Sequence, residues 1–194
     1  MSALRLYIAG RDEPLRATLD AVAEQVEFLN RLNEKDEVAK RLDLLDMLAN
    51  ADRRATMAQK YDDAVARLYS ALEALARNRL LMAYGIKNGA IKLEQIPDNN
   101  KDRFQRFFDT EDSVFKLGLQ ASYQLLNALG DDLGKRYASR ENELDKVLNI
   151  RNQSRLAHGT EPVRQETFEK MREILMEFAE ARAEDLPRFP ELKL

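Results

Sequence analysis

The 194-residue sequence contains no cysteine and a single histidine, His158. The absence of cysteine excludes a disulfide framework, a thiol nucleophile and a cysteine-ligated zinc or iron–sulfur site. With one histidine, a metal site made of protein ligands would need several carboxylates, and the sequence contains no Glu-x-x-His pairing. We therefore expect neither a metal ion nor another cofactor.

The chain is also poor in turn residues, with 7 glycines and 5 prolines. A β-sandwich or an α/β protein of this length normally needs more of them. Long stretches are instead rich in good helix formers. Apolar residues at helical spacing predict helices over about 14–32, 35–56, 58–84, 111–129, 131–158 and 163–184, with a short one near 101–109. The predicted fold class is all-α, an antiparallel bundle of about six or seven helices joined by short loops.

No apolar run in the sequence approaches the roughly 20 residues of a membrane span. The N-terminal stretch MSALRLYIAGRDEP does not resemble a signal peptide, because its apolar run is short and interrupted by Arg5. We expect a cytoplasmic protein with no membrane contact. The net charge of −3 argues against broad binding to duplex nucleic acid, but it leaves room for a small basic groove.

The segment NIRNQSRLAHG, Asn149 to Gly159, interrupts an apolar pattern with two arginines and the histidine. The spacing of four, three, four and three residues predicts one helical stripe, made of Leu144, Leu148, Arg151, Arg155 and His158. One interpretation is an ordinary helix end. A glycine often follows the last turn of a helix, and the helix dipole stabilises cations there. The other is a chemical site that addresses one bound group.

The chemical interpretation follows from what these side chains can do. Arg151 offers a fixed fork of donors to phosphate oxygens. His158 can transfer a proton near neutral pH, and Asn152 adds a neutral donor and acceptor. An arginine and a histidine without metal ligands suit phosphodiester cleavage by an internal nucleophile. RNA carries such a nucleophile in its 2′-OH group, and DNA does not.

The run RNQSRLAHG resembles the R-x(4–6)-H motif of HEPN ribonucleases. Arg151 and His158 are separated by six residues, and Asn152 is the polar residue after the arginine. Together with the earlier run QKYDDAVARLYSALEALARNRL, the segment resembles the HEPN half of CARF–HEPN accessory ribonucleases of type III CRISPR systems. The resemblance covers about residues 55–180 and implies a HEPN-like antiparallel bundle that acts in CRISPR-linked antiviral defence.

The resemblance implies a homodimer in which two motifs meet in one groove and cut single-stranded RNA without a metal. Attack by the 2′-OH would give a 2′,3′-cyclic phosphate and a 5′-OH. His158 would act as acid and base or orient the phosphate. Arg151 would stabilise the charge of the transition state, and Asn152 would hold the motif or the phosphate. Arg155, to which the motif assigns no role, would be a substrate contact.

Two other functions stay open from the sequence. One is a HEPN-fold dimer that binds RNA or a protein partner with little or no cleavage. The other is an unrelated helical interaction protein with an ordinary capped helix. RNA cleavage in the presence of a chelator, lost on His158→Ala, separates the enzyme from both.

We expect a HEPN domain over residues 56–194 and an N-terminal helical extension or linker, residues 1–55, that packs on the bundle. A CARF domain is an α/β fold, and the sequence shows no alternation of strands and helices. The chain is therefore predicted to be an excised or stand-alone HEPN domain, with a CARF regulatory domain as a partner in a longer parent protein.

Overall fold

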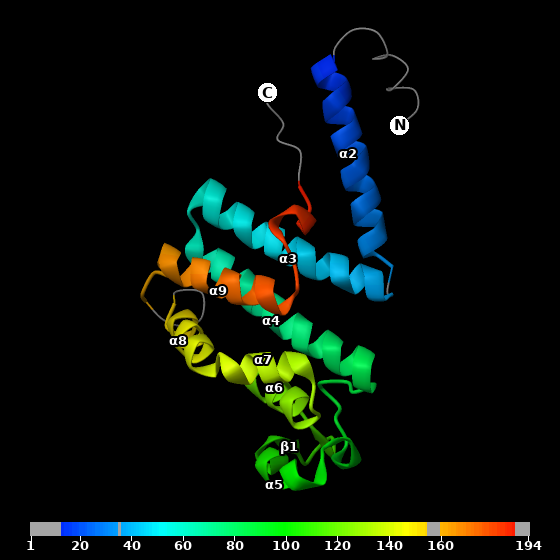
Figure 1. The fold of residues 1–194 in the computed structure, drawn as a ribbon, viewed down its shortest axis with the longest axis vertical. Helices are drawn as coiled ribbons and strands as arrows, with labels where there is room; N and C mark the ends of the chain where they lie inside the picture. The colour runs from blue at the N-terminus through cyan, green and yellow to red at the C-terminus, as the bar shows by residue number, and fades with distance from the viewer. Residues whose placement is uncertain (1–12, 35, 155–159, 189–194) are drawn as a thin grey trace.

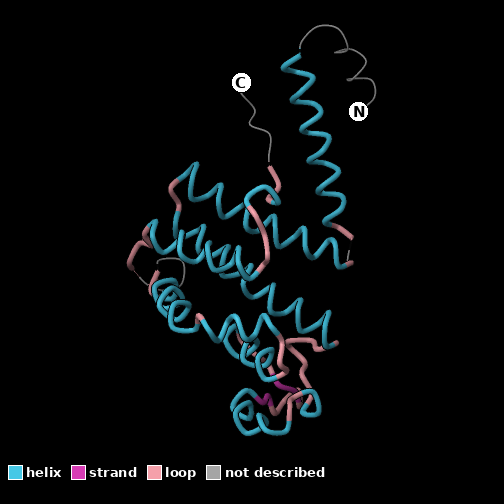
Figure 2. Tube along the Cα trace, in the orientation of Figure 1, coloured by secondary structure: helices cyan, strands magenta, loops and turns pink. Residues whose placement is uncertain are grey.

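The computed structural model describes residues 13–34, 36–154 and 160–188. This part of the chain forms eight α-helices and almost no sheet, so the predicted all-α, HEPN-like fold class is confirmed (Figures 1 and 2). The helices are α2 (Glu13–Leu32), α3 (Glu37–Ala58), α4 (Tyr61–Tyr84), α5 (Lys101–Phe104), α6 (Leu119–Ala128), α7 (Asp132–Ser139), α8 (Glu141–Asn152) and α9 (Gln165–Phe178). None of the helices in these described ranges is long and apolar enough to cross a membrane.

Helix α4 is the centre of the bundle and contacts α3, α6, α8 and α9. Val65, Leu68 and Leu72, spaced three and four residues apart, are almost completely buried. Such spacing places them on one helix face, which is why this helix can be covered by several neighbours. The helix ends before Gly85, whose φ of +65° is the left-handed conformation that glycine adopts without strain.

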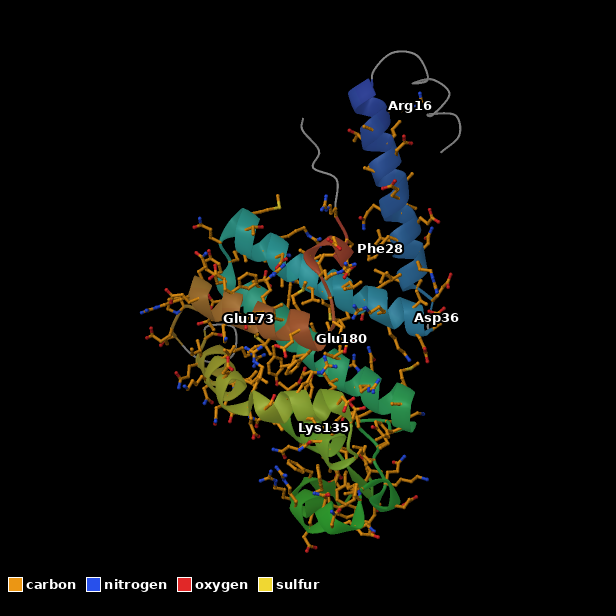
Figure 3. All side chains as sticks on the ribbon, viewed as in Figure 1. Arg16, Phe28, Asp36, Lys135, Glu173 and Glu180 are labelled. Atoms are coloured by element: carbon orange, nitrogen blue, oxygen red, sulfur yellow. The ribbon has the colours of Figure 1, made fainter. Side chains whose placement is uncertain are left out.

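Helices α2 and α3 form the N-terminal part of the described chain. The side chain of Asp36 caps α3 by accepting the N–H of Ala39 at 2.8 Å, and it also pairs with Arg31 at the end of α2. Figure 3 shows Asp36 at the corner between the two helices. Helix α3 packs along α4, whereas α2 extends away from the bundle (Figure 1). The domain boundary between residues 55 and 56 stays a prediction; this position lies inside α3.

A hairpin module, residues 86–118, separates α4 from α6 and lies at the end of the molecule opposite α2 (Figures 1 and 2). Strand β1 (Phe108–Asp109) pairs antiparallel with β2 (Val114–Phe115). The Asp109 carboxylate accepts the backbone N–H groups of Glu111 and Asp112 at 3.0 and 3.1 Å and fixes the turn. The helix predicted over 111–129 is therefore wrong in its first part, since α6 begins only at residue 119.

The single helix predicted over 131–158 is also wrong, because the chain forms two helices there. The break lies at Arg140, with φ −114° and ψ 13°. Its guanidinium bonds to Glu173 on α9 at 3.0 Å and also to Glu177, so the turn between α7 and α8 is tied to α9. Gly134 lies inside α7. A Cβ atom there would stand 2.1 Å from the backbone nitrogen of Asn127, so glycine allows α7 to approach α6 closely.

Candidate functional site

The structure describes two of the four predicted site residues, Arg151 and Asn152, at the C-terminal end of α8. Arg155 and His158 lie outside the described residues. Helix α8 ends at Asn152, and Ser154 already pairs with Glu161 in a β-bridge. The prediction that one helix carries the stripe from Leu144 to His158 is therefore wrong. The interpretation in which His158 and Gly159 form an ordinary helix end concerns residues outside the described ranges and stays a prediction.

The guanidinium of Arg151 lies over the ring of Tyr69, with its central carbon 4.1 Å from the ring centroid. One of its nitrogens donates to the side-chain oxygen of Asn152 at 3.1 Å. A guanidinium has five N–H donors along its edge, and the stack occupies its face. In the described part of the chain no carboxylate pairs with Arg151. The stack on Tyr69 covers the face of the guanidinium and leaves its edge donors unused by that contact, and such an edge suits an anion such as a phosphate.

Tyr69 comes from the central helix and was not predicted from the sequence as a site residue. Burial raises the pKa of its phenol, and the charge and hydrogen bond of Glu73, one turn along α4, raise it further. The phenol therefore stays neutral. Glu73 interacts with its hydroxyl group, and Arg151 covers one face of its ring. The buried face of α4 runs through the neighbouring Leu68, so Tyr69 lies at the edge of that face, where its ring can support Arg151. The sequence feature that could have identified Tyr69 as a site residue is its place as an aromatic residue at the edge of a buried helix face.

A pocket of about 490 Å³ lies beside this arginine–tyrosine pair. Tyr69 contributes to its wall from α4, and Arg106 and Phe107 contribute from the hairpin module. The start of α6 and the end of α8, including Asn152, complete it. The pocket thus joins the candidate motif to segments that are far apart in the sequence.

A network of charges fixes the other end of α8. Arg140 pairs with Glu143 on α8 at 3.1 Å, as well as with the two glutamates on α9. Lys170 on α9 also reaches Glu143, at 2.8 Å. Hydrogen bonds from Arg140 and then Lys170 lower the pKa of the Glu143 carboxyl from 4.5 to about 2. These pairs hold α8 against α9 and so contribute to the position of Arg151.

The family model of the Csm6 HEPN domain matches residues 32–182, which is most of the chain. The chain therefore belongs to the HEPN-domain family of CRISPR-associated Csm6-type ribonucleases, as its sequence motifs indicated. The family points to an RNA-related, CRISPR-associated ribonuclease function in general terms. Comparisons with curated proteins and with solved structures give no match. Within the described ranges, no group of three or more His, Cys, Asp or Glu residues could hold a metal ion.

Proposed function

We propose that this protein is a metal-independent endoribonuclease that cuts single-stranded RNA. The 2′-oxygen attacks the adjacent phosphorus and loses its proton, while the bond from phosphorus to the 5′-oxygen breaks and that oxygen gains a proton. The products are a 2′,3′-cyclic phosphate and a 5′-OH. A flexible single strand reaches the required in-line geometry more easily than a stacked duplex.

The residue roles follow from the chemistry of the side chains. His158 moves the proton or orients the phosphate, because imidazole titrates near neutral pH. Arg151 stabilises the negative charge that develops on the phosphate oxygens. Asn152 orients Arg151 through their hydrogen bond, and Arg155 contacts the substrate strand. The observation that best supports this proposal is the position of Arg151, which is stacked on Tyr69, bonded to Asn152 and paired with no carboxylate among the described residues.

We also propose that the active form is a homodimer in which two copies of the motif form one groove. In a longer parent protein, a CARF domain would regulate this groove. The prediction is a dimer in light scattering at micromolar concentration. A clean monomer that still cuts RNA would rule out the composite groove.

The test is a gel assay of labelled single-stranded RNA with excess EDTA. We expect Arg151→Ala and His158→Ala each to lower the rate by at least about 100-fold, the scale of a lost charge stabiliser or acid–base group. Arg16→Ala is the matched control, since it removes the same charge from α2, away from the bundle (Figure 3). A folded wild-type protein that binds the RNA and leaves it intact would instead support a binding module.

A further inference from the structure

The pocket beside Arg151 has the composition of a site for a neutral, planar group. Its aromatic residues are Tyr69 and Phe107, and its polar side chains are mostly uncharged amides. The amides are those of Gln120, Gln124, Asn149 and Asn152. Arg106 is the one charged residue in the described lining, and its guanidinium carbon lies 4.6 Å from the centre of the Phe107 ring. An isolated phosphate would be held better by several cations.

One amide in this wall lacks a partner. The side-chain oxygen of Gln124 is buried and accepts no hydrogen bond from any described residue. A buried unpaired acceptor destabilises a folded protein, so a ligand donor would relieve this cost once the Gln124 amide turns toward the pocket that its side chain lines. The neighbouring amides are partly engaged, because Gln120 donates to Asp145 at 2.7 Å and Asn152 accepts from Arg151. Gln124 therefore has an unmet acceptor, and the amide nitrogen of Asn152 is a further donor.

We propose that this pocket binds the base of a nucleotide adjacent to the phosphate that is cut, an inference that rests on the proposed ribonuclease function. Side-chain amides pair with donors and acceptors on the edges of bases, and aromatic or guanidinium planes stack on base faces. The volume of about 490 Å³ lies within the usual range of small-ligand pockets. Asn152 belongs to both the motif and the pocket wall, so a base in the pocket lies next to the phosphate held by Arg151.

The fold offers a direct way to fill the pocket. Gly118 lines it, has an extended backbone with φ −76°, and would direct a Cβ atom into open space. Gly118→Leu should therefore occupy the pocket without disturbing the bundle. Gly89→Leu is the matched control: it makes the same change in the hairpin module, also into open space, at a residue outside the pocket lining. Gln124→Met is a second variant that removes only the unpaired acceptor and its amide.

The probes are fluorescent 2′-O-methyl oligonucleotides of one sequence, which cannot be cut by 2′-oxygen attack. Each member of the set lacks the base at a different position. We expect loss of one particular base to weaken binding to wild type about tenfold, as for the loss of one stacked or paired base. This position dependence should disappear in Gly118→Leu, diminish in Gln124→Met and persist in Gly89→Leu.

Equal binding of every abasic probe by wild type would overturn the base site, and so would an unchanged preference in Gly118→Leu. Cleavage of natural RNA is measured in parallel with the same proteins. Cleavage without base-dependent binding refutes this inference alone. Base-dependent binding without cleavage refutes the proposed catalysis and leaves the base site standing.

Discussion

Gly134→Ala sets two opposite effects on stability against each other. Alanine is a better helix former than glycine by about 1 kcal/mol in a helix interior. At Gly134, however, the new Cβ would stand 2.1 Å from the nitrogen of Asn127 and 2.5 Å from the carbonyl carbon of Leu126. Both are backbone atoms, so no rotamer change relieves the overlap, and α7 must move away from α6.

Moving α7 has a further cost, because Tyr123 on α6 stacks on Tyr137 of α7 with ring centroids 4.2 Å apart. Overpacking costs about 1–3 kcal/mol, and an aromatic pair contributes about 0.5–1.5 kcal/mol. After the helix-propensity gain is subtracted, we expect Gly134→Ala to lower the free energy of unfolding by about 2 kcal/mol.

Urea unfolding followed by circular dichroism measures this change as a lower midpoint with an unaltered slope. Gly89→Ala is the matched control, because a Cβ at Gly89 meets no atom within 4 Å, and it should be close to neutral. A Gly134→Ala protein as stable as wild type, or more stable, would refute the close-packing argument.

Substitutions at three other residues test contacts of the site and of the bundle. Tyr69→Phe should keep RNA cleavage within about twofold of wild type, because the ring remains under Arg151, whereas Tyr69→Leu should lower kcat/KM by about two- to fivefold through the lost cation–π contact. The pKa of Glu143 is lowered by folding, so its stabilising effect is present above its unfolded pKa of 4.5 and is lost as the pH falls toward 2. In thermal unfolding, Glu143→Gln should therefore show a smaller decrease in Tm over that pH range, and an equal decrease would contradict this role. Asp131→Ala removes the buried N-cap of α7 and its 2.7 Å pair with Arg79, so urea unfolding should show a loss of about 2–4 kcal/mol, and a loss below 0.5 kcal/mol would contradict the stabilising role.

Helices whose stability comes from a repeating apolar face could be predicted from the sequence. The face of α4, with Val65, Leu68 and Leu72 on one stripe, is the clearest case. The hairpin module could not be predicted in this way. Its turn depends on one side chain, Asp109, which accepts two backbone N–H groups, and this contact leaves no periodic pattern.

The break at Arg140 was missed for a similar reason. Its position depends on glutamates of α9 that lie more than thirty residues away in the sequence. The role of Gly134 could not be predicted either, because this glycine permits a close helix contact that only the packed structure reveals.

The residues of the candidate site could likewise be predicted only in part. Arg151 and Asn152 are neighbours in a short motif, so the sequence identified them. Tyr69, Phe107 and Gln124 come from three other segments, and only folding brings them to one pocket. Periodicity cannot predict such a meeting, because it describes one helix at a time.

The most direct test of the central claim is the chemistry of the product ends. Single-stranded RNA is incubated with wild-type protein in excess EDTA, and the fragments are analysed by mass spectrometry. We predict 2′,3′-cyclic phosphate and 5′-OH ends, with no cleavage at a linkage whose 2′-OH is replaced by hydrogen and none by His158→Ala. Fragments with 5′-phosphate ends, or equal cleavage at the 2′-deoxy linkage, would contradict attack by the 2′-oxygen.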